Sequence, residues 1–480
     1  MASVFSLHPS TFLSPLKTTK LRTKFQTLHS SQKPFLISSL KFKQLDPKIP
    51  RQVQTFWNWL CDEGVVSIKT PVKPAIVPEG LGLVAKKDIA KGETVLGVPR
   101  RLWINTDTVA KSEIGNLCTG LEPWISIALF LIREKWKDDS KWKYFIDVLP
   151  ESTDSTIYWS EEELSEIQGT QLLSTTLSVK DYVQNEFQKV EDEVILGNKQ
   201  LFPFRITLDD FFWAFGILRS RAFSRAGIQN LMLVPFADLA NHSAKVTTED
   251  HIHEVDGPAG LFSWDLLLSF QSPLKLKAGD QFLIQYGLKK SNADMAIGYG
   301  FIEPGSARDT FTLTLEISKH DDFYKDKLDI AESNGLGETS DFDIKLGQSL
   351  PPALFPYLRL VALGGTDASL LESFSRKAVW DHLELPVSRA NEELICKIVR
   401  DACKSALSGY HTTTEEDAKL MKEGNLSSRL QIAVGVRAGE KVVLQQIDNI
   451  FREREWKLDE LEYHQEKRLK DLDQAKVRNS

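Results

Sequence analysis

The chain has 480 residues, a formal net charge of −7, 42% hydrophobic residues and 26% charged residues. These values are ordinary for a folded protein of two or three domains, and they exclude a wholly disordered chain and a fibrous repeat. No uncharged apolar stretch approaches the roughly 20 residues that span a bilayer, so we predict no membrane partner. The four cysteines contain no Cys-x-x-Cys pair, which argues against a disulfide framework and against a zinc-cysteine site.

The N-terminus differs in charge from the rest of the chain. Residues 1–45 contain no Asp or Glu, seven Lys or Arg and thirteen Ser or Thr. This composition is typical of an organelle transit peptide, and the opening Met-Ala-Ser favours the chloroplast, although an uncleaved basic tail has the same composition. Removal of these seven positive charges leaves −14. An acidic body lacks the basic face that phosphates need, so we predict no nucleic-acid partner.

Helical and strand-like patterns alternate in blocks along the first half. A short amphipathic helix is predicted from Gln52, and a Gly- and Pro-punctuated, β-branched stretch follows over residues 65–104. The pattern is helical from about 108 to 223. Helices are predicted over residues 124–137 and from an N-cap at Thr207 through FFWAFGILRSRAF.

The second half repeats this alternation. Strand character covers residues 231–315, helices dominate from about Ser349, and the last helix is predicted over residues 438–469. Cys396 and Cys403 are seven residues apart, which places them on one helix face with a packing role. The sequence therefore predicts an α+β fold, in which a β-rich unit is interrupted by a helical insertion and followed by a helical lobe. We expect the chemistry in the β-rich unit.

One short segment in the β-rich part is rich in glycine. Glu79-Gly80-Leu81-Gly82-Leu83 has two glycines one residue apart, which permits a tight turn and close approach of backbone to a ligand. A plain hairpin turn has the same pattern. The segment is not Gly-x-Gly-x-x-Gly, and no long helix follows it, so a dinucleotide site is not indicated.

A second segment combines charged and hydrogen-bonding side chains. Arg221 and Arg225 are four residues apart and would share a face on a helix. Asp238 and the adjacent Asn241-His242 follow in a predicted loop. The arginines either pair with Asp238 or meet an anionic ligand, and a capped turn with a satisfied histidine is the plainer alternative.

A third segment places two tyrosines beside glycines. Tyr286 precedes Gly287, and Tyr299 lies between Gly298 and Gly300, each tyrosine at the end of a predicted strand. Such tyrosines supply an aromatic wall and a hydroxyl to a narrow pocket, although ordinary core tyrosines show the same pattern.

In this order the three segments resemble the SET-domain protein lysine methyltransferases. The helical insertion resembles the split-SET arrangement. Stretches such as VQTFWNWL, DSTIYWSEEEL, TLDDFFWAFGILRSRAFSR, LRLVALGGTDA and VLQQID resemble the plant members that methylate the Rubisco large subunit, over about 430 residues. The resemblance implies a transit peptide at 1–45, a SET domain at 46–305 with an insertion at about 108–220, and an all-helical protein-substrate-binding domain at 306–480.

The resemblance also implies a site for S-adenosylmethionine without a metal. The cofactor-binding residues that it implies are Glu79, Gly80, Leu81, Arg221, Asn241 and His242. The substrate-binding residues that it implies are Arg221, Arg225, Asp238, His253, Tyr286, Ala296 and Tyr299. A guanidinium such as that of Arg221 suits the cofactor carboxylate. Tyr286 is the expected catalytic tyrosine.

Three positions depart from the family pattern. His253 stands where the resemblance would place a tyrosine, and Gly287 and Gly298 stand where it would place aspartates. These differences put the catalytic rate in question more than the fold.

The implied reaction is methylation, to the trimethyl state, of a protein lysine in the chloroplast stroma. The implied substrates are the Rubisco large subunit and/or chloroplast fructose-bisphosphate aldolase. Two alternatives remain: a metal-dependent enzyme built on His251, His253, His242 and Glu254, and a weakly catalytic protein that binds a stromal partner through its helical lobe.

Overall fold

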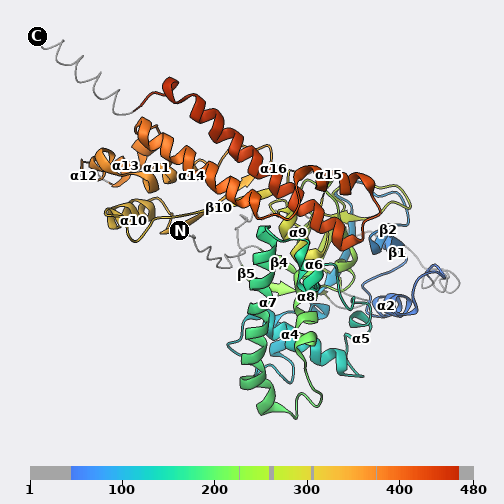
Figure 1. Cartoon of the computed structure of the whole chain (residues 1–480). Coiled ribbons are helices and arrows are strands. Elements are labelled where there is room, and N and C mark those ends of the chain that lie inside the picture. Colours follow the sequence, from blue (N-terminus) through green and yellow to red (C-terminus); the bar gives the residue numbers. More distant parts are fainter. Residues whose placement is uncertain (1–44, 226–227, 259–263, 304–306, 374–375, 464–480) are drawn as a thin grey trace, which may run out of the picture. The chain divides into compact units, whose positions relative to one another are not determined.

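The computed structural model describes residues 45–225, 228–258, 264–303, 307–373 and 376–463, and Figure 1 shows their elements. These residues form two compact units, a strand-rich unit of residues 45–153 and 178–289 and a helical unit of residues 154–177 and 290–463. Apart from Leu45, the predicted transit peptide lies outside the described residues. The predicted domain boundaries stay predictions. Among the described helices, none has both the length and the apolar character needed to cross a membrane.

The strand-rich unit holds short sheets between helices. The helix α7 (Gln171–Val190) contributes residues to both units. The elements of the strand-rich unit are α2 (Arg51–Asp62), β1 (Val72–Val77), β2 (Gly80–Ala85), β3 (Thr94–Pro99), α3 (Thr106–Ala110), α4 (Pro123–Trp136), α5 (Lys143–Ile146), α8 (Leu208–Arg221), β4 (Phe223–Arg225), β5 (Ile228–Met232), the 3-10 turn η5 (Ala237–Leu239), β6 (Asn241–His242), β7 (Ile252–Pro258), β8 (Trp264–Gln271) and β9 (Leu283–Ile284).

The strand pairing brings distant parts of the sequence together. β1 and β2 form the predicted hairpin, with Val77 opposite Gly80. The free edge of β2 pairs with the segment before β9, because the Phe282 N–H donates to the Leu83 carbonyl at 2.7 Å. β9 then runs parallel to β6, and β3, β8 and β7 form a separate antiparallel sheet in that order. The glycine-rich hairpin and the Asn-His pair thus meet through one strand segment.

The predicted helices of this unit are confirmed with small shifts. α2 and α4 begin within one residue of their predicted starts, and α4 is buried on all sides from Ile125 to Ile132. Thr207 caps α8 in a capping box with Asp210. The helix ends at Arg221, because Ala222 turns extended and Phe223 begins β4. The prediction that helix continues through Phe223 is therefore wrong by two residues.

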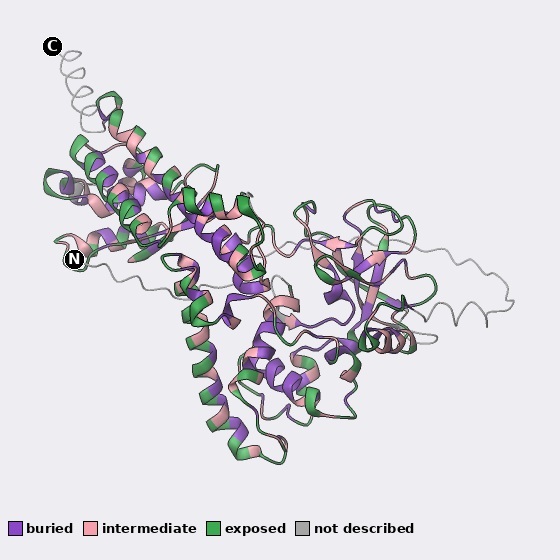
Figure 2. Ribbon diagram, turned by 45° about the vertical axis from the view of Figure 1, so that its right-hand side comes forward, coloured by how far each residue is buried: buried purple, intermediate pink, exposed green. Residues whose placement is uncertain are grey.

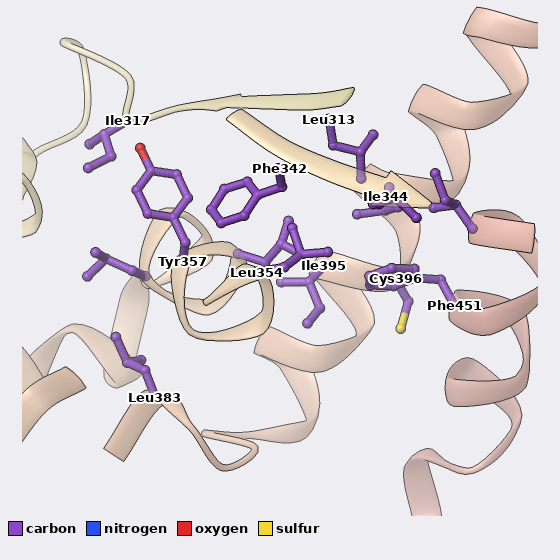
Figure 3. Packing of buried hydrophobic residues seen from close by; sticks show 14 of the residues in the cluster. Leu313, Ile317, Phe342, Ile344, Leu354, Tyr357, Leu383, Ile395, Cys396 and Phe451 are labelled. Atoms are coloured by element: carbon purple, nitrogen blue, oxygen red, sulfur yellow. The ribbon is translucent and has the colours of Figure 1, made fainter. Parts of the chain in front are cut away.

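The helical unit packs its helices and one pair of antiparallel strands around an apolar core. Its helices are buried on one face and exposed on the other (Figure 2). Side chains from β10 and β11, such as Leu313 and Phe342, face Leu354 and Tyr357 of α11 (Figure 3). The elements of the unit are α6 (Glu161–Ser165), α9 (Asn292–Tyr299), β10 (Thr310–Glu316), α10 (Tyr324–Ser333), β11 (Thr339–Lys345), α11 (Leu354–Ala362), α12 (Ser369–Ser373), α13 (Arg376–Leu383), α14 (Arg389–Ser408), α15 (Thr414–Glu423) and α16 (Ser428–Trp456).

The C-terminal region is helical but not all-helical. β10 and β11 pair antiparallel from Thr310–Lys345 to Glu316–Thr339, so the expectation of an all-helical region is corrected by one pair of strands. In β11, buried and exposed side chains alternate over only a few residues. Phe342 and Ile344 are buried, whereas Asp341 and Asp343 are exposed. A strand of seven residues with acidic outward positions gives a weak sequence signal.

The last helix starts earlier than predicted. α16 covers Ser428–Trp456 instead of 438–469, with Ser427 as its N-cap, and residues beyond 463 lie outside the described chain. The prediction for the cysteines is confirmed, since Cys396 and Cys403 both lie in α14 and are fully buried. Burial raises the pKa of the two thiols to about 11 and about 12, which keeps them protonated at neutral pH.

A buried carboxyl makes the stability of this unit depend on pH. Glu440 of α16 is 4% exposed and accepts hydrogen bonds from the Tyr410 hydroxyl at 2.7 Å and from the Gln171 N–H at 3.1 Å. Burial raises the pKa of Glu440 from 4.5 to about 7, and nearby Asp309 adds to the shift. The folded protein therefore keeps a proton that the unfolded chain releases.

We expect the free energy of unfolding to fall by about 3 kcal/mol between pH 4.5 and pH 7 because of Glu440. The contribution is fully present below the unfolded pKa and is lost as the pH rises through the folded pKa. Urea unfolding of the wild type and a Glu440→Gln variant, at pH 5 to 8, isolates the effect, because the amide does not titrate. A constant difference between the two proteins across this range contradicts the prediction.

Candidate functional site

The glycine-rich segment forms the turn and first residues of a hairpin. Glu79 lies in the turn between β1 and β2, and Gly80 has a φ of +108°, a conformation that glycine adopts without strain. Glu79 and Gly80 are exposed, and Leu81 is half-buried. The predicted tight turn is thus present.

Side-chain amides link this hairpin to the Asn-His pair. The Asn241 Nδ2 donates to the Gln281 Oε1 at 2.7 Å and lies 3.5 Å from the Leu81 carbonyl. The Gln281 Nε2 in turn donates to the Glu79 carboxylate at 3.1 Å. The backbone at Gly82 passes so close that a Cβ there would lie 2.7 Å from both amide groups. The structure therefore brings together the two predicted cofactor segments, from positions about 160 residues apart.

Tyr286 is held against the same strand pair at both of its ends. Its backbone N–H donates to the His242 Nδ1 at 3.2 Å, and its hydroxyl donates to the Ala240 carbonyl at 2.9 Å. The rings of His242 and Tyr286 are tilted, with centroids 5.2 Å apart. A tyrosine hydroxyl that donates in this way can also accept a hydrogen bond.

The residues around Tyr286 also fasten its turn. The Gln285 Nε2 donates to the Val246 carbonyl at 2.7 Å, and its Oε1 accepts from the Gly287 N–H at 3.3 Å. The Leu288 N–H donates to the Glu249 carboxylate at 2.6 Å. This turn is therefore tied to the loop that follows Asn241-His242.

Arg221 and Asp238 form an ion pair whose aspartate is buried. The Arg221 Nη1 lies 3.0 Å from the Asp238 Oδ2, and the aspartate side chain is 1% exposed. Burial raises the pKa of Asp238, and Arg221 opposes that shift. The Arg221 Nε and the Asp238 Oδ1 are buried without a hydrogen-bond partner in the described structure. The pair therefore has unused donor and acceptor capacity for a ligand.

The expected helical pairing of the two arginines is wrong. Arg221 ends α8, whereas Arg225 ends the short strand β4. The two residues therefore share no helix face, because the helix stops one turn too early. The role predicted for Arg225 stays a prediction.

The backbone is strained next to Asp238. Phe236 has a φ of +77° and is fully buried, with its ring edge-on to Trp57 at 5.8 Å between centroids. A non-glycine residue in this region costs on the order of 1–3 kcal/mol and persists only where packing enforces it. Phe236 is the residue directly before η5, and η5 contains Asp238, which pairs with Arg221.

Ala296 and Tyr299 lie in the helical unit. Both belong to α9, which starts in a capping box of Ser291 and Asp294 and ends at Gly300, with a φ of +78°. The expectation that Tyr299 ends a strand is therefore wrong. The Lys290 Nζ lies 5.7 Å from the centre of the Tyr299 ring. Their predicted place in a substrate channel stays a prediction.

The histidines of the 251–253 segment do not form a metal cluster. His253 lies exposed on β7, whereas His251 precedes that strand and is 2% exposed. Burial lowers the pKa of His251. Within the described residues, no group of three or more His, Cys, Asp or Glu side chains is placed to hold a metal ion. The structure thus offers no support for the metal-dependent alternative.

The two glycine departures have different surroundings. Gly287 has a φ of +153°, which few other residues adopt. Gly298 lies inside α9, and a Cβ there would meet nothing within 4 Å. Gly287 thus follows Tyr286 in a conformation suited to glycine, whereas Gly298 has room for a side chain.

The sequence pattern does not single out Gln281 or Glu249, and it gives Gln285, which precedes Tyr286, no role of its own. Each of them bonds to a residue at least 39 positions away along the chain. The pairs are Gln281–Asn241, Gln285–Val246 and Glu249–Leu288. A single polar residue in a strand pattern carries no signal of such a distant partner. For Gln281, the partner follows from the pairing of β2 with the segment before β9, where Gln281 bridges Val84.

Comparison with known proteins extends this picture. A family model described as Rubisco LSMT substrate-binding matches residues 318–444. The chain is 79% identical over 476 residues to the chloroplastic ribulose-1,5 bisphosphate carboxylase/oxygenase large subunit N-methyltransferase of Nicotiana tabacum, covering 98% of this chain and 97% of the relative. It is 59% identical over 456 residues to the chloroplastic fructose-bisphosphate aldolase-lysine N-methyltransferase of Arabidopsis thaliana, covering 94% of each chain.

Solved structures match over most of the chain as well. The crystal structure of the SET domain of LSMT bound to lysine and AdoHcy matches with a TM-score of 0.84 and 65% identity, covering 89% of this chain and 96% of that chain. Rubisco LSMT bound to sinefungin and monomethyllysine matches with a TM-score of 0.83 and 63% identity, covering 88% of this chain and 97% of that chain.

Proposed function

Because this chain belongs to the SET-domain protein lysine N-methyltransferases of the chloroplast, we propose that it methylates a lysine of the Rubisco large subunit, of chloroplast fructose-bisphosphate aldolase, or of both. We place this reaction in the stroma. The observation that carries the proposal is full-length similarity to relatives named for each of these substrates, at 79% and 59% identity. The substrate-binding family match at 318–444 supports a folded protein as the substrate.

The residues of the strand-rich unit suit S-adenosylmethionine. Arg221 has a buried Nε without a partner in the described structure, and a guanidinium binds a carboxylate with paired hydrogen bonds. Gly82 leaves room that a side chain would fill beside Asn241. We assign the cofactor to Arg221, to the hairpin at residues 79–81 and to Asn241-His242. When bound, the cofactor supplies a methyl group on a positively charged sulfur.

In this proposal, Tyr286 positions the lysine amine that receives the methyl group. Its hydroxyl donates to the Ala240 carbonyl, and in the proposed complex the hydroxyl oxygen would accept from the lysine amine and face the partial positive charge of the moving methyl group. The enzyme needs no nucleophile of its own, because the neutral lysine nitrogen would form its bond to the methyl carbon as the carbon–sulfur bond of the cofactor breaks and S-adenosylhomocysteine leaves. Positioning and fixed oxygen dipoles then supply the rate enhancement.

The amine must be neutral when it attacks. A free lysine has a pKa of about 10.4, so roughly one in 250 is neutral at pH 8. Removal of water around the amine and proximity to the positive sulfur both lower its pKa. The aromatic side chain of Tyr286 excludes water on one side of the site that we propose.

We further propose that the product is trimethyllysine. A neighbour in the solved structures holds monomethyllysine, which supports a site that admits an amine already carrying one methyl group. The roles of Arg225, Asp238, His253, Ala296 and Tyr299 in holding the substrate are part of the same proposal.

The proposal is tested by methyl transfer from labelled S-adenosylmethionine. Protein from Asp46 onward is incubated separately with unmethylated Rubisco and with chloroplast aldolase, and mass spectrometry locates the lysine and counts its methyl groups. We expect label on at least one of the two, with trimethyllysine as the final product. Each substrate without enzyme serves as the control.

The outcomes separate the parts of the proposal. Label on aldolase alone upholds lysine methylation and excludes the Rubisco large subunit as a substrate. Label that stops at one methyl group overturns the trimethyl product. Bound S-adenosylhomocysteine with no label on either protein overturns the proposed substrates and favours a binding protein that acts through its helical lobe.

A further inference from the structure

We propose that Gln281 is a positioning residue of the cofactor site, which orients Asn241 and joins it to Glu79. The inference rests on the proposed assignment of the hairpin at 79–81 and of Asn241 to S-adenosylmethionine. Neither the sequence pattern nor the family resemblance singles out Gln281. Its contacts in the structure do.

The backbone holds Gln281 between the two segments. Asp280 accepts from the Ala85 N–H at 2.8 Å, and Phe282 donates to the Leu83 carbonyl at 2.7 Å. Gln281 itself forms an antiparallel bridge with Val84. Two residues later the chain joins Asn241 through the β6–β9 pairing. The segment that contains Gln281 therefore pairs with the hairpin at one end and with the Asn-His strand at the other.

An amide suits both contacts at this position. Gln281 donates to the Glu79 carboxylate at 3.1 Å and accepts from the Asn241 Nδ2 at 2.7 Å. A carboxylate side chain only accepts, and lysine or arginine only donates, so none of them makes both bonds. An amide has one group of each kind at the same end of the side chain.

The bridge sets the orientation of the Asn241 amide. Since Gln281 takes the NH₂ end, the carbonyl end of Asn241 is turned away from Gln281, toward any ligand that donates a hydrogen bond. The absence of a side chain at Gly82 makes this possible, because a Cβ there would lie 2.7 Å from each of the two amide groups. Gln281 thus acts on the cofactor through Asn241.

The test replaces Gln281 by methionine, which has a similar length and makes neither hydrogen bond. We expect Gln281→Met to weaken S-adenosylhomocysteine binding about five- to tenfold in calorimetry and to raise KM for S-adenosylmethionine by a similar factor. We expect kcat and Tm to stay close to the wild-type values. A Gln271→Met variant is the matched control, since Gln271 is also half-buried at a strand end and has no side-chain bond to these segments.

A double substitution tests the direction of the two hydrogen bonds. Gln281→Glu alone places two carboxylates together, and we expect it to bind more weakly than Gln281→Met. In Glu79→Gln/Gln281→Glu, the amide at 79 donates to the carboxylate at 281, which still accepts from Asn241. We expect the double variant to recover most of the lost affinity while Tm stays the same in all three variants, whereas a purely structural role would move affinity and Tm together.

The outcomes distinguish this inference from the proposed function. Wild-type affinity and KM in Gln281→Met overturn the inference while methyl transfer by the wild type upholds the function. A fall in Tm with no specific rise in KM also overturns it. Failure of the wild type to bind S-adenosylhomocysteine overturns both.

Discussion

A Tyr286→Phe variant is expected to lose about 100- to 1,000-fold in kcat for methyl transfer and to keep its affinity for S-adenosylhomocysteine. The substitution removes one oxygen and leaves the ring. The backbone N–H of residue 286 still donates to the His242 Nδ1, at 3.2 Å in the wild type, so the turn keeps its anchor. The loss is therefore confined to the hydroxyl that faces the reacting atoms in the proposed mechanism.

The size of this effect follows from what the hydroxyl does in the transition state. A preorganised polar group next to developing charge costs no reorganisation during the reaction, and removal of one such group typically costs two to three orders of magnitude in rate. The Ala240 carbonyl, which is buried, holds the hydroxyl by accepting its proton at 2.9 Å. Phenylalanine leaves that carbonyl unpaired and the amine without its acceptor.

A second tyrosine provides the matched control. The Tyr463 hydroxyl also donates to a backbone carbonyl, that of Leu458, at 2.6 Å, and the residue is buried in the helical unit. We expect Tyr463→Phe to lower Tm slightly and to leave kcat unchanged. Steady-state assays on both variants, with calorimetric binding of S-adenosylhomocysteine, provide the measurements. Full activity in Tyr286→Phe would show that another group orients the amine.

Elements with local signals could be predicted from the sequence. The capping box at Thr207 and Asp210 marked the start of α8, and the Glu79-Gly80 turn marked the first hairpin, because these signals act within a few residues. The same kind of signal is present at Ser291 and Asp294. There a capping box and a left-handed Gly300 define α9, and the glycines around Tyr299 suggested a strand end instead.

The contacts of the candidate site could not be predicted in this way. The family resemblance supplied Asn241, His242 and Tyr286 as residues, but not the hydrogen bonds among them. Gln281 lies 40 residues from Asn241 and 202 residues from Glu79 along the chain. Such pairs depend on how strands combine in the folded chain, and no periodicity in the sequence records that combination.

Buried charge explains the error in the last helix. Amphipathic patterns assume that charged residues face water. In α16 the buried face includes Arg437, Glu440 and Lys441, each at most 4% exposed. Of the three, Arg437 lies directly before the predicted start at residue 438, which is ten residues after the true start of the helix. The same three residues make the stability of this helix sensitive to their partners.

Asp417 is the shared partner of two of these cations. It lies on α15, is fully buried, and accepts from the Arg437 Nε at 2.7 Å and from the Lys441 Nζ at 2.7 Å. The Thr412 hydroxyl donates to it at 2.9 Å. The remaining carboxylate near Arg437 is Glu166, which is 40% exposed. Among the described residues, Asp417 is therefore the only fully buried carboxylate that forms an ion pair with Arg437 or Lys441.

We expect Asp417→Asn to destabilise the helical unit by about 3–5 kcal/mol, because it leaves two buried cations with one partly exposed carboxylate. At this size of domain the loss corresponds to a fall of about 10 °C in Tm. Thermal unfolding followed by circular dichroism gives the measurement. Glu423→Gln on the same helix is the control, since its ion pair with Lys419 is exposed and contributes little.

A triple variant distinguishes a broken charge network from a network that is itself stabilising. Asp417→Leu/Arg437→Met/Lys441→Met removes all three charges together, so no charge is left buried without a partner. Replacement of a whole buried ion network by apolar residues of similar volume is often neutral, whereas loss of one member is costly. We therefore expect the triple variant to be more stable than Asp417→Asn. If the triple variant is the less stable of the two, the hydrogen bonds of Lys441 to the Thr412 and Thr413 carbonyls, at 2.6 and 3.3 Å, hold the end of α15 more than charge balance does.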